Sequence, residues 1–237
     1  LTSLTYLGIG YNKLNGYIPS EIASLTNLTY LVLSDNFLSG GIPPELGDLI
    51  NLTYLDLGSN NIGGEIPADL GKLTNLINLD LESNELTGII PDDFCSQGDS
   101  SPDLRYNKLC PPYPDCLSQY VGYQDIVECP GVYELWGGLY YAEGVVELDL
   151  SESELEGPIP SVIGNFINLT FLDLSNNQIS GSIPDEIGNL TSLGHLDLSF
   201  NDLTGSIPAS IGGLTMLTEL RLYANSCLLY TSPSPRD

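Results

Sequence analysis

Residues 49–72 read LINLTYLDLGSNNIGGEIPADLGK, and the chain repeats this stretch with small changes. Rows of 24 residues align when they begin at Leu1, Leu25, Leu49, Leu73, Ala142, Phe166, Leu190 and Leu214. The seventh and ninth positions of every row are Leu or Ile, and the twelfth is Asn except at Ser153. Self-similarity at a fixed period of this length indicates a solenoid built from stacked repeats.

Each row predicts a short strand followed by a turn. Leu7 and Ile9 alternate with Tyr6 and Gly8, so a strand here places Leu7 and Ile9 inside and the other two outside. Asn12 and its equivalents follow the strand, where their amides can bond backbone groups that the turn leaves unpaired. One row alone buries too little apolar surface to fold, so we expect stability to come from contacts between neighbouring rows.

The rows resemble the plant-type leucine-rich repeat, LxxLxxLxLxxNxLxGxIPxxLGxL, over eight rows or roughly four fifths of the chain. The resemblance implies an α/β solenoid, a right-handed superhelix of horseshoe shape. It implies a parallel β-sheet on the concave side and 3₁₀ or irregular segments on the convex side. It also implies similarity to receptor-like and secreted ectodomains that recognise ligands.

The period divides the chain into four regions. We expect a first array of four repeats over residues 1–96, and a second array of about four repeats, truncated, over residues 142–226. Between them, residues 97–141 contain a degenerate half-repeat and a Cys-rich cap or island. Residues 227–237 break the period and match a translated transposase sequencing adapter, so we interpret them as non-native. Two arrays joined by a cap and one array with an island both fit this pattern.

Four cysteines crowd the region where the period fails: Cys95, Cys110, Cys116 and Cys129. A zinc site is one interpretation, but no His lies nearby and the spacing lacks paired CxxC motifs. Two disulfides are favoured instead, with three pairings left open. Disulfides indicate an oxidising compartment, so we expect an extracellular or cell-surface location.

The charge balance excludes several classes of function. The chain of 237 residues has 6 Lys and Arg against 31 Asp and Glu, which gives a net charge of −25. Nucleic-acid binding needs clustered basic residues, so it is excluded, and a basic partner is favoured. No apolar run is long enough to span a bilayer. The one histidine, His195, has no evident paired nucleophile, so we expect no enzyme, no cofactor and no metal site.

The predicted concave face supplies the candidate binding residues. These are Tyr6, Tyr30, Tyr54, Asn78, Asp56 and Asp80 in the first array, and Glu147, Asp149, Phe171, Asp173, His195 and Asp197 in the second. Tyrosine gives a large contact area with a polar tip, which suits a binding surface. The neighbouring aspartates repel one another, and a cation or a basic partner would relieve that repulsion. A calcium site on these aspartates is a secondary hypothesis.

The function expected from these features is recognition of a protein, peptide or polysaccharide on the concave face, by a fragment of a larger secreted or surface protein. The alternatives are the ectodomain of a transmembrane receptor-like kinase and the non-catalytic targeting region of a secreted enzyme. Oligomeric state is not predicted. Four Asn-Leu-Thr sequons, at Asn27, Asn51, Asn168 and Asn189, could carry N-glycans in a eukaryote.

Overall fold

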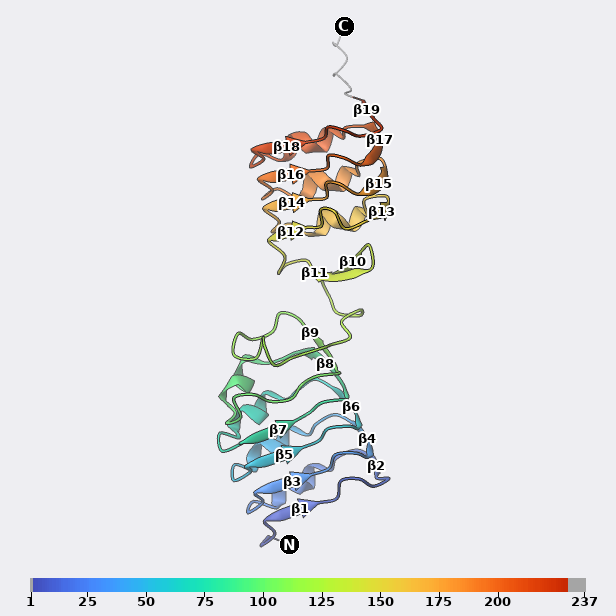
Figure 1. Cartoon of the computed structure of the whole chain (residues 1–237). Coiled ribbons are helices and arrows are strands. Elements are labelled where there is room, and N and C mark those ends of the chain that lie inside the picture. The colour runs from blue at the N-terminus through green and yellow to red at the C-terminus, as the bar shows by residue number, and fades with distance from the viewer. Residues whose placement is uncertain (1, 230–237) are drawn as a thin grey trace. The chain divides into compact units, whose positions relative to one another are not determined.

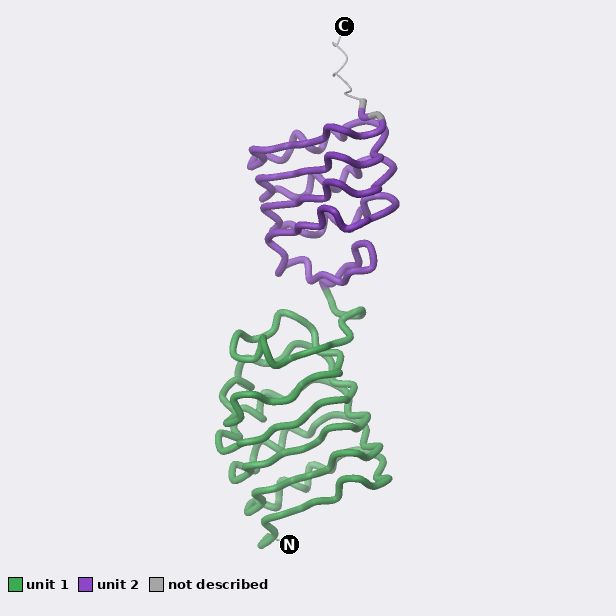
Figure 2. Tube along the Cα trace, in the orientation of Figure 1, with its two compact units in different colours: residues 1–130 green, residues 131–237 purple. Residues whose placement is uncertain are grey.

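A computed structural model describes residues 2–229 and divides the chain into two compact units, unit 1 (residues 1–130) and unit 2 (residues 131–237) (Figure 2). The boundary between Pro130 and Gly131 falls inside the segment 97–141, so the Cys-rich residues belong to unit 1 and the start of the next array belongs to unit 2. Each unit contains its own hydrophobic core.

Unit 1 carries a parallel sheet of four short strands, in the order β1 (Tyr6–Gly8), β3 (Tyr30–Val32), β5 (Tyr54–Asp56) and β7 (Asn78–Asp80) (Figure 1). The register pairs each residue with the one 24 positions later, as in Tyr6 with Tyr30 and Tyr30 with Tyr54. The row length therefore sets the register directly, and equal positions of successive rows form straight ladders.

A second parallel ladder in unit 1 contains β2 (Asn15–Gly16), β4 (Phe37–Gly40), β6 (Asn61–Gly64), β8 (Glu85–Ile89) and β9 (Lys108–Cys110). The 3₁₀ helices η1 (Ser20–Ser24), η2 (Pro44–Asp48), η3 (Ala68–Lys72) and η4 (Asp92–Ser96) follow it in successive rows. Gly40 and Gly64 have φ of 76° and 75°, a region that glycine adopts readily, where this ladder turns toward the helices. A proline precedes each 3₁₀ helix, as Pro43 precedes η2.

The row asparagines connect consecutive rows. The Asn60 Nδ2 donates to the carbonyl of Leu33 in the preceding row at 3.1 Å and to that of Leu57 in its own row at 3.1 Å. The Asn60 Oδ1 accepts from the backbone N–H of Leu38 at 3.0 Å. The asparagine therefore satisfies groups of two rows at once, and the predicted role of this position is present in the structure.

The interior of unit 1 consists of the row leucines and isoleucines, with Leu31, Leu55 and Leu79 almost fully buried. The prediction that Ile9 is buried is wrong, because 38% of its surface is exposed. Ile9 lies in the first row of the array. Among the described residues, only the second row packs against it. Burial in a stacked array comes from both neighbours, so a row with one neighbour keeps part of its apolar surface in water.

The Cys-rich segment closes the other end of unit 1. Cys95 pairs with Cys116 and Cys110 pairs with Cys129, which confirms disulfides and selects one of the three open connectivities. Within the cap, the Gln124 Oε1 accepts from the backbone N–H of Leu109 at 3.0 Å, the role that a row asparagine has elsewhere. The cap thus continues the polar ladder with a longer amide.

Unit 2 begins with an antiparallel hairpin, β10 (Val132–Leu135) and β11 (Gly138–Tyr141). Its parallel sheet has the order β12 (Glu147–Asp149), β14 (Phe171–Asp173), β16 (His195–Asp197) and β18 (Glu219–Arg221). The second ladder contains β13 (Glu156–Gly157), β15 (Gln178–Gly181), β17 (Asp202–Ser206) and β19 (Cys227–Leu229), and the 3₁₀ helices are η5 (Ser161–Asn165), η6 (Asp185–Asn189) and η7 (Ala209–Gly213).

The segment interpreted as an adapter translation is only partly described. Its first three residues form β19, whose backbone pairs with β17. The rest of that segment, residues 230–237, lies outside the described residues. Among the residues described, no helix combines the length and the apolar character that crossing a membrane requires.

Candidate ligand-binding faces

The outward side chains of β1, β3, β5 and β7 form one surface, here called face 1. The rings of Tyr6 and Tyr30 stack with their centroids 5.8 Å apart, and those of Tyr30 and Tyr54 stack 5.5 Å apart with 15° between their planes. Tyr30 is 43% exposed although a ring lies on each side of it. The ring faces are therefore turned toward one another, and the ring edges and hydroxyl groups are left for a ligand.

Two carboxylates lie beside this tyrosine stack, on the same strands. Asp56 Oδ2 accepts a hydrogen bond from the Ser34 hydroxyl at 2.8 Å, and Asp80 Oδ1 accepts one from the Glu82 backbone N–H at 2.9 Å. Burial, together with the nearby carboxylates of which Asp56 is the strongest, raises the pKa of Asp80 to about 6. Among the described residues neither Asp56 nor Asp80 has a Lys or Arg partner.

Face 1 also carries an unsatisfied acceptor. The Oδ1 of Asn78, next to Tyr54 in the sheet, is buried and has no donor among the residues that the structure describes. Burial raises the pKa of Tyr54, with further contributions from Asp56 and Asp80, so its hydroxyl is a neutral donor at pH 7. Face 1 thus presents tyrosine hydroxyl donors and two carboxylates, whereas the Asn78 Oδ1 acceptor lies beneath the surface.

The corresponding surface of unit 2, here called face 2, is formed by the outward side chains of β12, β14, β16 and β18. The Phe171 ring and the His195 imidazole stack with centroids 4.5 Å apart and 13° between their planes. The His195 Nδ1 lies 2.9 Å from Glu219 Oε2. Glu147, the remaining predicted residue of this ladder, is exposed beside Phe171.

The aspartates of face 2 differ from those of face 1 because a cation is present. Arg221 Nη1 lies 3.1 Å from Asp197 Oδ2, and its Nη2 lies 2.5 Å from Glu219 Oε1. Asp197 is 3% exposed. Burial raises its pKa, but hydrogen bonds from Ser199 and the Arg221 guanidinium outweigh burial and lower it overall.

The repeat pattern now has independent support. The family profile described as Leucine Rich Repeat matches residues 3–25, 27–49, 51–73 and 75–97, and the profile described as Leucine Rich repeats (2 copies) matches residues 167–209. Together they cover more than half of the chain. The chain belongs to the leucine-rich repeat family. Its parallel strands and short 3₁₀ helices form the expected leucine-rich repeat solenoid.

Several solved structures are similar to this chain. The plant peptide hormone receptor RGFR1 in complex with RGF2 is 34% identical over 96% of this chain and 35% of the receptor chain, with a TM-score of 0.47. The Arabidopsis receptor kinase HAESA ectodomain in complex with an extended IDA peptide is 32% identical over 94% of this chain and 38% of the receptor chain, with a TM-score of 0.45. A plant ice-binding protein is 28% identical over 97% of this chain and 74% of the ice-binding protein, with a TM-score of 0.48.

This leucine-rich repeat chain spans 35% of the RGFR1 chain and 38% of the HAESA chain. A search of curated proteins finds no significant match.

The structure brings the predicted face residues together in two groups, but not into one site. Tyr6, Tyr30, Tyr54, Asn78, Asp56 and Asp80 share face 1, whereas Glu147, Asp149, Phe171, Asp173, His195 and Asp197 share face 2. Glu219 and Arg221 are not among the residues predicted for face 2, although both form ion pairs there. The repeat period places Glu219 and Arg221 one row after His195 and Asp197 on the same face, but it does not indicate the ion pairs that they form.

Three of the four sequon asparagines have a structural role. The Nδ2 atoms of Asn27, Asn51 and Asn168 donate to carbonyl groups of the preceding row at 2.7, 2.8 and 2.9 Å. Asn189 lies at the end of η6 and is exposed. The atom to which a glycan would be attached is therefore already bonded at three of these positions.

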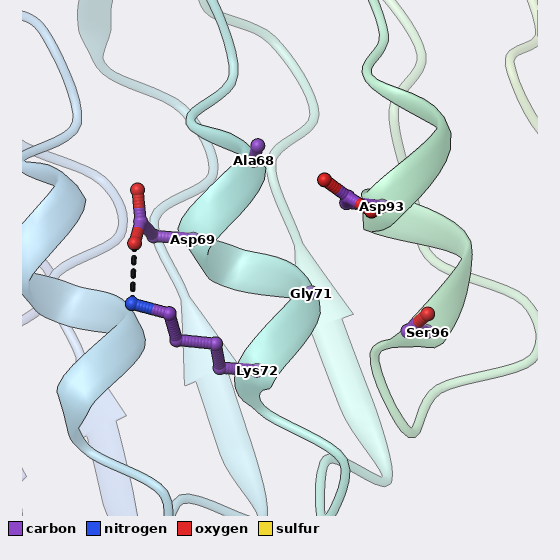
Figure 3. A pocket seen from close by; sticks show the side chains of 6 residues that line it. All are labelled: Ala68, Asp69, Gly71, Lys72, Asp93 and Ser96. Atoms are coloured by element: carbon purple, nitrogen blue, oxygen red, sulfur yellow. Dashed lines mark hydrogen bonds and ion pairs between the residues drawn. The ribbon is translucent and has the colours of Figure 1, made fainter.

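A shallow hollow also lies between η3 and η4, outside the two faces (Figure 3). Its lining includes Lys72, which forms an ion pair of 2.5 Å with Asp69, as well as Gly71 and Ser96. The ion pair is exposed to solvent, so it contributes little binding energy. Among the described residues no hydrogen bond joins Ser96 to another side chain of this hollow, and we assign the hollow no function.

Proposed function

We propose that this chain is an interaction module whose face 1 binds a peptide, or an extended segment of a protein, that carries a basic side chain. The observation that carries the proposal is the stack of Tyr6, Tyr30 and Tyr54 beside two aspartates without a cation partner. Solenoids use such extended surfaces for binding.

The geometry of the stack favours a peptide over a polysaccharide. A sugar ring binds an aromatic side chain mainly through the open face of the aromatic ring. Both faces of Tyr30 are turned toward neighbouring tyrosines, at centroid distances of 5.8 and 5.5 Å. The accessible parts are hydroxyl groups and ring edges, which suit hydrogen bonds to backbone amides and contacts with aliphatic side chains.

Unit 2 supplies an internal example of how a cation fits the aspartate position. There Arg221 reaches back by one row and contacts the buried carboxylate of Asp197 at 3.1 Å. In unit 1 the carboxylates of Asp56 and Asp80 occupy the same positions of their rows without such a partner. An Arg or Lys of a bound peptide would supply the missing positive charge, and the net charge of −25 would attract that peptide.

The two disulfides support a location in an oxidising compartment, so we place this interaction at the cell surface or outside the cell. Four of the cysteines are paired within unit 1, and a reducing cytosol would not maintain these bonds.

A random peptide library displayed on phage, selected on the full chain, tests the proposal. We expect enriched peptides to contain Arg or Lys, and Y30A and Y54A to weaken their binding about tenfold or more. D56N/D80N should weaken binding and reduce its dependence on salt. Y17A is the matched control, because Tyr17 is 75% exposed but lies outside the strands of face 1.

Two results would contradict the proposal. Selected peptides that bind Y30A, Y54A and Y17A equally well would show that face 1 is not the site. Selective binding to an immobilised glycan array, lost in Y30A while no peptide is enriched, would show that the ligand is a carbohydrate. Urea unfolding of each variant separates a binding defect from a folding defect.

A further inference from the structure

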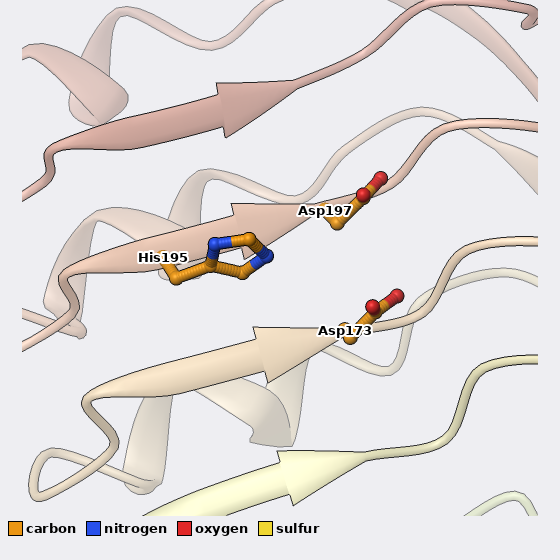
Figure 4. Close-up of side chains that lie close together, drawn as sticks. All are labelled: Asp173, His195 and Asp197. Atoms are coloured by element: carbon orange, nitrogen blue, oxygen red, sulfur yellow. The ribbon is translucent and has the colours of Figure 1, made fainter.

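Three potential ligands for a metal ion converge on face 2. Asp173 lies at the end of β14, and His195 and Asp197 lie on the neighbouring strand β16 (Figure 4). The two strands pair with Asp173 opposite Asp197, and His195 is two residues before Asp197, so all three side chains project from one surface of the sheet. One ligand atom from each residue lies within 4.8 Å of the others.

The hydrogen bond of His195 determines which ring nitrogen can bind a metal ion. Glu219 accepts at Nδ1, and an ionised carboxylate has no proton to donate, so the imidazole proton lies on Nδ1. The Nε2 atom then presents its lone pair. Nε2 is buried and has no hydrogen-bond partner among the described residues, and in Figure 4 the ring extends toward the two carboxylates.

We propose that Asp173, His195 and Asp197 bind a divalent transition-metal ion, for which Zn²⁺ is the matching probe. Glu219 acts as the positioning residue, because a carboxylate that accepts from the distal nitrogen fixes the tautomer and orientation of a metal-binding histidine. The stacked ring of Phe171, 4.5 Å away, restricts the imidazole plane. This inference is independent of the peptide site on face 1.

The local charge matches a divalent ion. Asp173, Asp197 and Glu219 are acidic and Arg221 is the cation that pairs with the last two, so these four groups leave two negative charges uncompensated. Asp149, opposite Asp173 on the preceding strand β12, adds to the negative field. A metal ion bound between Nε2 of His195 and the two carboxylates would supply the positive charge that these groups lack.

The donor set selects among metals. One imidazole nitrogen with two carboxylate oxygens suits Zn²⁺ and its first-row neighbours, whereas Ca²⁺ and Mg²⁺ prefer oxygen ligands only. With Zn–N and Zn–O distances of about 2.0–2.2 Å, ligands of one ion lie about 3–4 Å apart. The ligand atoms lie within 4.8 Å of one another, so metal binding requires them to move closer together. Asp197 is held by Ser199 and Arg221, whereas Asp173 accepts only from the Ser175 backbone N–H, at 2.8 Å, so Asp173 is the ligand expected to move.

Unit 1 contains a natural version of the site without the histidine. Asp56, Asn78 and Asp80 occupy the positions of Asp173, His195 and Asp197. The fold therefore accepts asparagine at this position, which makes H195N a conservative variant that should remain folded. The same comparison predicts that unit 1 has no equivalent transition-metal site.

The test is a titration of the full chain with Zn²⁺. Calorimetry measures the binding, and NMR records the imidazole signals of His195. His195 is the only histidine, so its resonances need no separate assignment. All proteins carry C227S, which removes the odd cysteine as a competing ligand. We expect one Zn²⁺ bound with a shift of the imidazole signals, and no such shift with Ca²⁺.

The variants distinguish a site from general attraction to an acidic surface. We expect H195N and D173N to weaken Zn²⁺ binding at least tenfold, and D149N to change it less than threefold. E219Q should weaken it about 10- to 100-fold and change the imidazole ¹⁵N shifts that report the tautomer. Equal binding by the parent and H195N, or imidazole signals that do not respond to Zn²⁺, would overturn the proposal.

Discussion

The backbone N–H of Ile62 donates to the Oδ1 of Asn84, one row later in the chain, at 3.0 Å. The Nδ2 of the same amide donates to the carbonyl groups of Leu57 and Leu81 at 3.0 and 3.2 Å. Asn84 is 6% exposed, so water cannot replace these bonds. A single side chain therefore holds polar backbone groups of two rows in the interior of unit 1.

Replacing this amide should be strongly destabilising. N84A leaves the buried N–H of Ile62 without a partner, while the carbonyls of Leu57 and Leu81 each lose one of two side-chain donors, so we expect the free energy of unfolding to fall by about 1–3 kcal/mol. Urea denaturation measures the loss. N12A is the exposed control, because Asn12 donates to the carbonyl groups of Ile9 and Gly10 in its own row. A loss in N12A as large as in N84A would show that burial is not the cause.

The disulfides should stabilise unit 1 selectively, since all four bonded cysteines lie in it. The bonds close loops with sequence separations of 21 and 19 residues. Removing either, as C95S/C116S or C110S/C129S, should lower stability by about 3 kcal/mol. Hydrogen exchange read by mass spectrometry, with and without reductant, should show faster exchange in residues 1–130 only. Equal acceleration in unit 2 would contradict this assignment.

Much of the architecture could be predicted from the period. A strand residue pairs with the residue 24 positions later, as Leu31 does with Leu55, so the row length predicts both the sheet and the ladders on its face. The glycine, proline and asparagine positions of the row follow from local backbone geometry. These features repeat, and each row supports the interpretation of the next.

The parts that could not be predicted depend on contacts outside the repeat. Gln124 replaces a row asparagine through a longer side chain, and no spacing in the sequence indicates it. The pairing of Cys110 with Cys129 depends on how the cap folds over the last row. Ion pairs such as Arg221 with Asp197 depend on the reach of flexible side chains, which a period does not describe.

Asp80 should make stability depend on pH. Its pKa is raised to about 6 in the folded chain, against about 3.9 when unfolded, so the folded state holds the proton more tightly. The folded state binds more protons between these values, and stability falls as pH rises from about 4 to 6. D80N removes this penalty. We expect it to gain about 1 kcal/mol at pH 7.5, after allowance for solvent screening, and nothing at pH 4.

Urea denaturation of D80N at both pH values checks this expectation. D149N is the control, because we expect it to change the free energy of unfolding in the opposite direction. The Ser151 hydroxyl and backbone N–H lower the pKa of Asp149, so its ionised form contributes stability above the unfolded pKa. D149N should therefore be less stable than the parent at pH 7.5. A gain in both variants would point to the reduction in net charge rather than to the burial of Asp80.

Arg221 should matter more for stability than a surface cation usually does. Its partner Asp197 is 3% exposed, so R221Q leaves a buried carboxylate without its positive partner, and we expect a loss of about 1–3 kcal/mol at pH 7. Because the pKa of Asp197 is lowered in the folded chain, its stabilising effect is present above the unfolded pKa of about 3.9 and disappears as pH falls through the folded value. The effect of R221Q should therefore shrink in acid.

Urea denaturation of R221Q at pH 7 and at pH 3 measures this difference. R105Q is the matched control, because Arg105 pairs with Asp103 and Glu82, which are 28% and 30% exposed. Its loss should stay within about 1 kcal/mol, as for other exposed ion pairs. If R221Q lost the same stability at both pH values, the effect would come from the packing of the Arg221 side chain and not from the charge of Asp197.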